Sequence, residues 1–512
     1  MIVQGHEITD ERSLSSHTVV GGSGSVGGVA AFHLAEAGID TIVLEEGGYH
    51  IASEFNQREE DMFPMLYRNG GQQPTSDGMV NVMQGSCYGG GTVINTSDCV
   101  PIPPEVLAHW QKLAGTGEWT EKSLADSYER VNDFINVKRN NKSLINRNNG
   151  LLMETAEKLG WKSHIMDSNR KGCVGSGYCV VGCAYDARLG TNLTYLPWAI
   201  EKGASVYTDV RCDRIERING SKYRVHCTVV ERGTRSARLP LRIDCERVIL
   251  AASSIHSPAI LFRSGIDGDL PQLGKNLTLQ PQLGVLGFFD DEYEIVHWRG
   301  APQSVAVDEF DDNSIDHGLG GFRMEGWGGV VGMPSVLLPG FGLDHKRMNA
   351  RMRHMSITAL EVPDRPSGEI SYQWAEDGRV TPKIDYLLKD EWKQRLKRGM
   401  RKSAELLFAA GAEEVAFANQ AFPPLQSPDE SSRIDQFPIE PGLANFVSAH
   451  NQGTCRMGSS KDNSVVDQNL RLHTGDNIYV MDASVMPSSA STHVMIPIMV
   501  VADRAVHRML ES

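Results

Sequence analysis

The chain has 512 residues, which at roughly 100–200 residues per domain predicts two or three domains. Its 64 acidic and 50 basic side chains give a net charge of −14, so nucleic acid is a poor partner, because binding to its phosphates begins with a basic surface. With 40% hydrophobic and 22% charged residues, the composition is that of a folded globular protein and excludes a disordered chain.

Targeting signals are not expected in this sequence. Residues 1–16 show no basic segment followed by an apolar run, so no signal peptide is predicted. No stretch approaches the roughly 18 apolar residues that a transmembrane helix needs. The nine cysteines are an odd number, which favours reduced thiols and a cytoplasmic location.

The first predicted elements lie between residues 18 and 45. Residues 18–20 form a short β-branched run, residues 29–37 favour a helix that stops at Gly38, and residues 41–44 form a second apolar run. This succession of strand, turn, helix and strand is typical of a dinucleotide-binding unit.

The turn of this unit carries Gly22, Gly24 and Gly27 in the spacing G-x-G-x-x-G. The first glycine allows a tight turn, the second lets a pyrophosphate approach the backbone, and the third lets helix and strand pack closely. The helix N-terminus stabilises the phosphate charge. Glu45, at the end of the second strand, is placed to accept hydrogen bonds from ribose hydroxyls, and Glu46 could share or take that role. The motif alone leaves FAD and NAD(P) open, although its position near the N-terminus suits FAD.

A second glycine cluster spans residues 85–95. Gly89, Gly90 and Gly91 are consecutive and lack Cβ atoms, so a flat group can approach the backbone there. Exposed N–H groups in such a turn can also form an anion-binding nest. The alternative interpretation is an unusual surface turn.

The middle of the chain begins with a polar helical pattern over residues 105–137, and residues 191–204 suggest an extended run followed by a short helix. Between them lie Cys173, Cys179 and Cys183. A structural zinc or iron–sulfur site normally has four ligands, so three cysteines favour a glycine-rich turn with small buried thiols. No metal ion is expected.

Residues 210–249 alternate apolar and polar side chains, which predicts antiparallel strands. Pro258 and Gly265 then mark the first turn and the end of a short helix. Residues 389–408 form an amphipathic helix, expected on the outer face of a second domain. Methionine and tryptophan are frequent before that helix, and they either line an apolar substrate cavity or belong to an ordinary core: Trp298, Met324, Trp327, Met333, Met348, Met352 and Met355.

Nearly from end to end, these motifs resemble those of the glucose–methanol–choline (GMC) oxidoreductases, which are flavin enzymes that act on alcohols. The N-terminal glycine loop resembles their FAD site, and Gly89–Asn95 resembles their first signature. Ser253–Ile266 resembles the second signature and departs from it at Asp267. Gly274–Leu277 resembles the segment that follows, although Gln280 replaces a frequent histidine.

The C-terminal segment carries the most informative match. His450–Gly458 resembles the family's H-x-x-G-T motif, and Tyr479–Ser484 resembles its D-A-S segment. In the family, the histidine of H-x-x-G-T is the active-site base, and an asparagine or histidine after D-A-S is its partner. The resemblance assigns these roles to His450 and His493, although Val494 departs from the common Asn-Pro step.

The resemblance implies an α/β fold (α+β overall) with two domains. A Rossmann-like FAD-binding domain is expected from residues 1–100, 185–290 and 446–512. A substrate-binding domain, with a mainly antiparallel sheet and covering helices, is expected from residues 101–184 and 291–445. The cofactor is expected to be FAD, bound non-covalently, because no histidine stands in the first signature, where some relatives attach their flavin.

Contacts to FAD are expected from several separate segments. Asp482 is placed to accept hydrogen bonds from the ribityl chain or from groups beside the pyrophosphate, and a helix beginning near Met495 would aim its positive end at the flavin. The full set of expected cofactor-binding residues is Gly22, Ser23, Gly24, Ser25, Gly27, Glu45, Glu46, Gly85, Gly90, Gly91, Asn95, Val210, Ala252, Ser253, Asp482, Ala483 and His493.

The chemistry of alcohol oxidation agrees with these assignments. It needs a base for the hydroxyl proton and an acceptor for the hydride, which is flavin N5. We assign His450 as the base, since a neutral imidazole accepts a proton near pH 7. His493 would orient the alcohol oxygen and stabilise its developing charge, although the two roles can be exchanged.

The sequence therefore predicts an FAD-dependent alcohol dehydrogenase or oxidase for an apolar or aromatic primary alcohol, with a sugar or polyol as the alternative substrate. The electron acceptor stays open between oxygen, a quinone and a cytochrome. Three other classes compete: a non-redox lyase on the same scaffold, such as a hydroxynitrile lyase, a fumarate-reductase-like flavin enzyme, and an NAD(P) dehydrogenase. The paired histidines argue against the fumarate-reductase-like enzyme.

Overall fold

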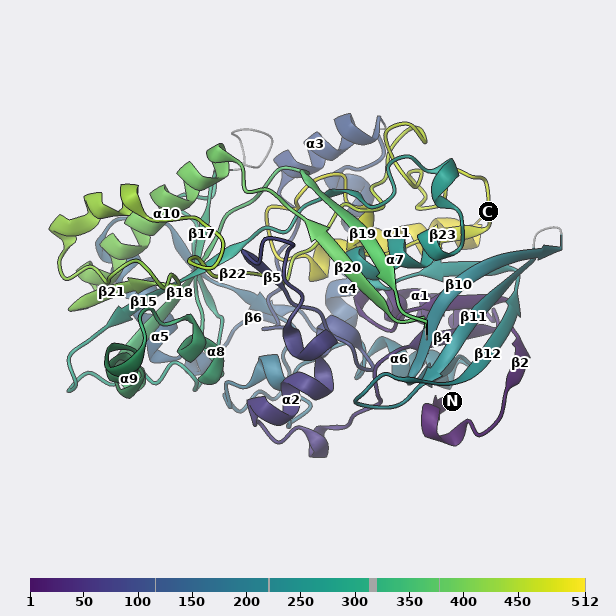
Figure 1. The fold of residues 1–512 in the computed structure, drawn as a ribbon, viewed down its shortest axis with the longest axis horizontal. Coiled ribbons are helices and arrows are strands. Elements are labelled where there is room, and N and C mark those ends of the chain that lie inside the picture. The colour runs from purple at the N-terminus through teal and green to yellow at the C-terminus, as the bar shows by residue number, and fades with distance from the viewer. Residues whose placement is uncertain (116, 220–221, 313–319, 377, 512) are drawn as a thin grey trace.

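Two sheet-containing layers lie side by side along the long axis of the molecule in the computed structural model (Figure 1). The structure describes residues 1–115, 117–219, 222–312, 320–376 and 378–511. One layer holds both termini and the other holds the middle of the chain. Among the described helices, none is both long and apolar enough to cross a membrane.

The first layer is built on a six-stranded sheet in which every neighbouring pair is parallel. Its central strands are mostly apolar and almost wholly buried, as expected for a parallel sheet that is covered on both faces. In spatial order the strands are β1 (Ile2–Gln4), β9 (Ser205–Thr208), β4 (Thr41–Glu45), β3 (Thr18–Gly21), β13 (Arg247–Leu250) and β23 (Ile478–Val480).

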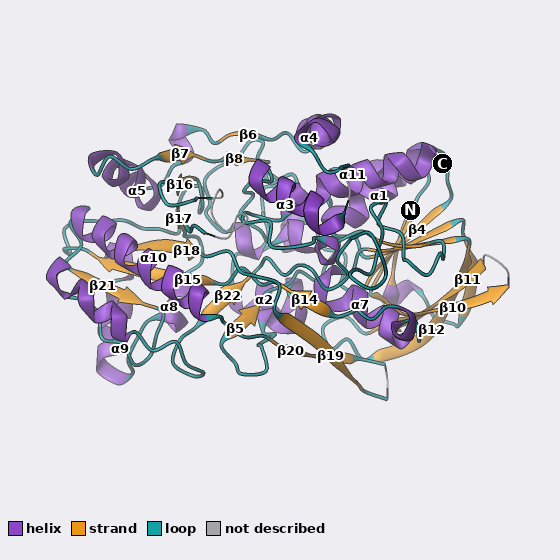
Figure 2. Cartoon of the chain, turned by 90° about the horizontal axis from the view of Figure 1, so that it is seen from above, coloured by secondary structure: helices purple, strands orange, loops and turns teal. Residues whose placement is uncertain are grey.

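Helices cover one face of this sheet and a second, smaller sheet covers the other (Figure 2). The helices are α1 (Ser25–Glu36), α3 (Pro104–Ala114), α4 (Glu121–Phe134), α6 (Tyr195–Glu201) and α11 (Met495–Glu511). The smaller sheet contains β10 (Val210–Asn219), β11 (Lys222–Val230), β12 (Ala237–Cys245) and β2 (Arg12–Ser15). As the alternation predicts, β10, β11 and β12 are antiparallel, whereas β13 joins the parallel sheet. Helices α3 and α4, which the sequence prediction assigns to the second domain, share the buried core of this first layer.

The second layer is a mainly antiparallel eight-stranded sheet. Helices α5 (Arg147–Lys158) and α10 (Asp390–Ala409) pack against its strands, and α10 turns its apolar side chains, including Trp392 and Leu396, into the core. The strands are β5 (Val80–Val82), β22 (Phe446–Ser448), β15 (Gln282–Phe288), β18 (Met355–Glu361), β17 (Arg323–Gly326), β16 (Val305–Val307), β7 (Ser163–Ile165) and β21 (Glu414–Phe417).

Further elements connect the two layers. The hairpin of β19 (Gly368–Trp374) and β20 (Val380–Asp385), joined by β14 (Lys275–Leu277), reaches across to the first layer (Figure 1). The remaining helices are α2 (Glu59–Leu66), α7 (Ser253–Arg263), α8 (Gly332–Leu337) and α9 (Gly342–Ala350), and a two-stranded sheet joins β6 (Lys138–Arg139) to β8 (Asp167–Ser168).

The helix predicted to start at Pro258 starts five residues earlier, so this prediction of its first turn was wrong. Pro258 lies inside α7 and lacks the N–H group that would bond to the carbonyl of Ser254. The hydroxyl of Thr454 donates to that carbonyl instead, at 2.6 Å. A side chain from a distant segment therefore satisfies the carbonyl group that the proline leaves unpaired.

Candidate functional site

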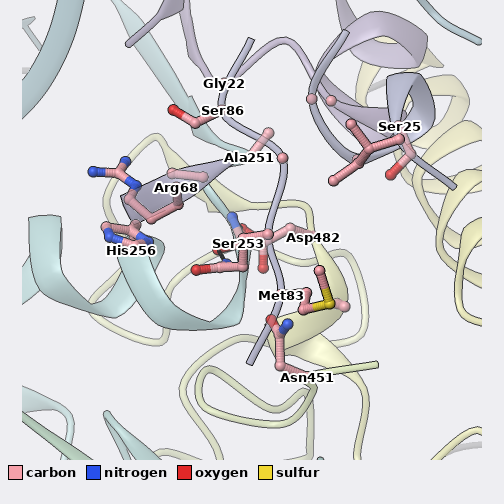
Figure 3. Close-up of a pocket in the computed structure, with 18 of the residues that line it drawn as sticks. Gly22, Ser25, Arg68, Met83, Ser86, Ala251, Ser253, His256, Asn451 and Asp482 are labelled. Carbon is pink, nitrogen blue, oxygen red and sulfur yellow. Dashed lines mark hydrogen bonds between the residues drawn. The ribbon is translucent and has the colours of Figure 1, made fainter. Parts of the chain in front are cut away.

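A cavity of about 370 Å³ lies between the two layers and is lined by segments from both. Figure 3 shows some of the side chains around it, among them Ser25, Arg68, Ser253 and Asp482. All of the residues predicted to bind the cofactor line this cavity, except Gly27. The folding of the chain thus gathers segments that are hundreds of residues apart in the sequence.

The glycine loop occupies the turn between β3 and α1. A Cβ on Gly22 would lie 2.2 Å from the carbonyl oxygen of Ala251, and one on Gly27 would lie 1.9 Å from the carbonyl oxygen of Gly22. Gly22 also has a φ of +124°, which disfavours other residues. By contrast, a Cβ on Gly24 would meet no atom within 4 Å. Two glycines therefore allow the chain to pack, and the third leaves the loop open toward the cavity.

The second glycine cluster packs directly on the first. A Cβ on Gly90 would lie 2.9 Å from the Cα of Gly24, so Gly90 has no room for a side chain there. Gly91, like Gly24, has no neighbour within 4 Å of an added Cβ. The two loops together form a side-chain-free part of the cavity wall.

Two adjacent carboxylates, Glu45 and Glu46, stand at the end of β4. Glu45 accepts hydrogen bonds from the hydroxyl of Ser23 at 2.5 Å and from the N–H of Gly47 at 2.9 Å, and burial raises its pKa. Glu46 pairs with Arg68, and although burial opposes ionisation, the charges of Arg68 and Arg235 lower the pKa of Glu46 to about 2. Both carboxylates line the cavity, and which of them would hold a ribose stays a prediction.

Asp482, which follows β23, anchors two backbone turns. It accepts hydrogen bonds from the N–H groups of Ser253 and Ser484, at 3.0 and 2.9 Å, and from the hydroxyl of Ser257. Burial raises its pKa. Asp482 therefore fixes the start of α7 against the C-terminal segment at the edge of the cavity.

The two histidines that the motif singles out face each other in this cavity. His450 follows β22 and His493 precedes α11, and their ring centroids are 5.0 Å apart with an interplanar angle of 88°. The buried side chain of Gln452 joins their segments, because it accepts from the N–H of Ala490 at 2.9 Å and donates to the carbonyl of His450 at 3.0 Å. Pro497 stands in the first turn of α11, where a missing N–H has little cost.

Two carboxylates that the sequence analysis did not find stand beside this pair. Glu325 of β17 lies 2.8 Å from Nε2 of His493, measured from its Oε2. Oε1 of Glu361, at the end of β18, lies 3.8 Å from Nε2 of His493 and 4.0 Å from Nδ1 of His450. Gln280, which replaces a family histidine, donates to Glu361 at 3.3 Å and accepts from Ser489 at 3.0 Å.

These carboxylates give the two histidines opposite protonation states. Burial opposes the charged form of His493, but Glu325 and Glu361 raise its pKa to about 10. Burial and the neighbouring His493 lower the pKa of His450 to about 3. Burial raises the pKa of Glu361 to about 7, whereas His493 lowers that of Glu325 to about 2 against the effect of burial. At neutral pH, His493 is thus a cation and His450 a neutral acceptor.

Glu361, His450 and His493 could also hold a metal ion, since one ligand atom from each lies within 4.8 Å of the others. The hydrogen bond from Nε2 of His493 to Glu325 competes with such an ion. The arrangement therefore suits the transfer of a proton better than the binding of a metal.

Apolar side chains form the end of the cavity that faces α2 and α8. The sequence left open whether its methionines and tryptophans line a cavity or belong to the core. Trp327 and Met333 line the cavity, whereas Met324, Met348 and Met355 belong to the buried core. Tyr67, Met83 and Val180 line the cavity as well and share one apolar cluster with Trp327 and Met333.

Comparisons with known proteins identify the family. Two models of the GMC oxidoreductase family match the sequence, one over residues 63–282 and one over residues 364–502. The chain belongs to the GMC oxidoreductase family. It is 31% identical over 486 residues to an uncharacterised GMC-type oxidoreductase of Mycobacterium tuberculosis, which covers 94% of this chain and 74% of that relative. It is 29% identical over 523 residues to a long-chain-alcohol oxidase of Arabidopsis thaliana, which covers 96% of this chain and 67% of the relative.

Solved structures of other oxidases share the fold. Pyridoxine 4-oxidase from Mesorbium loti superimposes with a TM-score of 0.73 at 17% identity, covering 97% of this chain and 99% of the other. A formate oxidase variant from Aspergillus oryzae gives a TM-score of 0.74 at 16% identity, covering 98% and 99% of the two chains. The predicted family and fold class are thereby confirmed.

This GMC oxidoreductase uses FAD, which confirms the predicted cofactor. The cavity residues fit that cofactor, because Gly24 and Gly91 leave open space at the start of α1, where a helix N-terminus stabilises phosphate charge. Buried carboxylates that can accept hydrogen bonds stand nearby at Glu45 and Glu46. The protein is therefore an FAD-dependent oxidoreductase.

Proposed function

We propose that this oxidoreductase converts an apolar or aromatic primary alcohol to its aldehyde, with His450 as the base and His493 as the group that holds the alcohol oxygen. The observation that carries the proposal is the buried histidine pair. The ring centroids of His450 and His493 are 5.0 Å apart, and the ring of His450 is neutral while that of His493 is cationic. An alcohol needs such a pair, because one group must accept the hydroxyl proton while another stabilises the charge left on oxygen.

Each residue of the pair has a defined task. His493, kept cationic by Glu325, donates a hydrogen bond to the alcohol oxygen and stabilises its alkoxide character. His450 accepts the hydroxyl proton, and Glu361, at 4.0 Å, stabilises the imidazolium that results. When bound, FAD supplies the acceptor for the hydride that leaves the substrate carbon. His450 cannot exchange roles with a protonated His493, because a cation does not accept a proton.

The lining of the cavity supports an apolar substrate. Tyr67, Met83, Val180, Trp327 and Met333 belong to one apolar cluster and line the cavity, so they present an apolar wall to a substrate. The Arabidopsis relatives are long-chain-alcohol oxidases by name, which is consistent with this preference. We propose a long aliphatic or an aromatic primary alcohol as the substrate.

An anaerobic titration tests the proposal. Purified holoenzyme is mixed with 1-octanol, benzyl alcohol or glucose, and the flavin absorbance is followed. Bleaching by the apolar alcohols is expected. His450→Ala should lower the bleaching rate by roughly 10²–10⁴-fold while the flavin stays bound.

His226→Ala is the matched control, because His226 lies on β11 and does not line the cavity. This variant should bleach at the wild-type rate. A flavin that no alcohol bleaches, or a His450→Ala variant as fast as the wild type, would contradict the proposed function.

A further inference from the structure

The turn between α8 and α9 carries large apolar side chains at the surface. Phe341 and Leu343 are 91% and 84% exposed, and Val336 of α8 is 69% exposed. Two hydrogen bonds hold the helices together, because the carbonyl of Ser335 accepts from Nε2 of His345 at 3.0 Å and the hydroxyl of Ser335 donates to Asn349 at 2.5 Å. We call Val336, Phe341 and Leu343 the apolar tip. Grouped side chains of this kind mark contact with another apolar phase, whereas single ones do not.

Cations flank the apolar tip. Lys346 and Arg347 on α9 are exposed and form no ion pair with any residue that the structure describes. The next two arginines differ, since Arg351 pairs with Glu413 and Glu414, and Arg353 with Glu294. Asp344 is the one acidic side chain of α9. Lys346 and Arg347 thus outnumber Asp344 on α9, and these two cations can contact an anionic surface although the chain has a net charge of −14.

The apolar tip and the cavity wall share helix α8. Met333 of α8 lines the cavity and precedes Val336 of the tip by three residues on the same helix. The N-terminus of α8 is held in place, because Glu59 of α2 accepts hydrogen bonds from the N–H groups of Val331, Gly332 and Met333 at 2.7–3.1 Å. A single short helix thus connects the exposed apolar surface to the apolar wall of the cavity.

We propose that the apolar tip docks this protein on an anionic lipid bilayer, so that an apolar alcohol dissolved in the bilayer reaches the cavity beneath α8. Exposed apolar side chains enter the acyl boundary while neighbouring lysine and arginine side chains contact the anionic headgroups. The benefit of docking rests on the proposed function, because it assumes an apolar alcohol as substrate. The docking itself depends only on the exposed side chains of the tip and of α9.

Vesicle sedimentation tests the docking. Holoenzyme is mixed with sucrose-loaded vesicles of phosphatidylcholine, with or without phosphatidylglycerol, and the bound fraction is measured from the flavin absorbance of the pellet. The wild type should bind the anionic vesicles more tightly. Phe341→Ser with Leu343→Ser should weaken that binding roughly tenfold or more, because two apolar anchors are lost. Lys346→Gln with Arg347→Gln should weaken it roughly fivefold per charge, and only on anionic vesicles.

Leu387→Ser is the matched control. Leu387 is 61% exposed and stands between β20 and α10, so it belongs to neither α8 nor α9. This variant should bind vesicles like the wild type. A wild type that binds no vesicles, or tip variants that bind as tightly as the wild type, would overturn the proposal. So would a dimer in gel filtration that Phe341→Ser with Leu343→Ser dissociates, because the tip would then contact a second copy of the chain.

Bleaching by water-soluble benzyl alcohol without vesicles separates the two proposals. The tip variants should bleach at the wild-type rate, because the tip lies outside the cavity. If the vesicles are bound through the tip but no alcohol bleaches the flavin, the docking holds and the proposed function fails.

Discussion

His493 keeps its proton at neutral pH because two buried carboxylates face it. Glu325 accepts a hydrogen bond from it at 2.8 Å, and Glu361 lies 3.8 Å away. The resulting positive charge lowers the pKa of His450, 5.0 Å away between ring centroids, and keeps that ring neutral. Although the two side chains are identical, their surroundings make His493 a proton donor and His450 a proton acceptor.

The pH dependence of flavin reduction should report this arrangement. The pKa of Glu361 is raised to about 7, so its carboxylate gains a proton as the pH falls through that value and no longer stabilises a protonated His450. The pKa of His493 is raised to about 10, so its hydrogen-bond donor is lost as the pH rises through that value. We expect a bell-shaped rate in anaerobic stopped-flow measurements, with its limbs near these two values.

Glu361→Gln identifies the acidic limb. This variant should lose that limb and lower the plateau rate by roughly 10- to 100-fold. Gln303→Leu is the control, because Gln303 donates to Glu325 and does not contact Glu361. An acidic limb that persists unchanged in Glu361→Gln would assign it to another group, such as Asp98, whose pKa burial also raises to about 7.

The residues that the sequence could predict are those with a fixed local spacing. His450 lies three residues before Gly453 in a recognisable motif, and the glycines of the first loop follow one another within six residues. Glu325 and Glu361 have no such spacing, because the pairing of β17 with β18 brings them to the site from separate strands. The available signal was weak: Glu361 is the one ionisable side chain in the otherwise uncharged strand Met355–Glu361.

At the scale of elements, the glycines of the first loop have different roles: Gly24 leaves space for a phosphate, and Gly27 allows α1 to pack against β3. Gly24→Ala adds a methyl group with no neighbour within 4 Å, so the fold should tolerate it while the added group obstructs the approach of a phosphate. We expect the melting temperature without added FAD to stay close to the wild-type value. The affinity for FAD, measured by flavin fluorescence, should fall roughly tenfold or more.

Gly27→Ala is the matched variant in the same loop. Its Cβ would lie 1.9 Å from the carbonyl oxygen of Gly22, so α1 must shift from β3. We expect a loss of about 1–3 kcal/mol in the free energy of unfolding, with or without FAD. Equal melting temperatures for the two alanine variants would refute the division of tasks between these glycines.

The start of α7 shows why the first residue of a helix cannot be predicted from the neighbouring sequence alone. Pro258 by itself predicts a first turn, and nothing near it in the sequence indicates five earlier helical residues. Asp482 and Thr454, about 200 residues away, supply the hydrogen bonds that extend the helix to Ser253. The type of this element could be predicted, whereas its first residue depends on tertiary contacts.

On the scale of the whole molecule, the predicted α/β fold class is confirmed. The domain boundaries themselves stay a prediction, because the layers exchange elements. Helices α3 and α4 pack into the first core, and β5 pairs with β22 in the second sheet. Short polar stretches between elements do not indicate which sheet the next element joins.

The hairpin of β19 and β20 should hold the cofactor between the layers. Arg263 of α7 lies over the ring of Trp374 at 5.4 Å and donates to the carbonyl of Gly378 at 3.0 Å, and all three residues line the cavity. The hairpin therefore closes the part of the cavity next to β10. Trp374→Ser removes the ring and opens this wall, so FAD should dissociate about fivefold faster, in line with a cation–π contact of about 1 kcal/mol at a partly exposed site.

The recovery of free flavin fluorescence after dilution of the holoenzyme measures this dissociation. Lys383→Ala on β20 is the control, since Lys383 pairs with Asp385 at the surface and does not line the cavity. The bleaching rate with benzyl alcohol should be the same in both variants when FAD is saturating, because the histidine pair is untouched. If FAD dissociates from Trp374→Ser at the wild-type rate, the first layer holds FAD without the hairpin. The contact between Arg263 and Trp374 would then stabilise the packing of the layers and would not retain FAD.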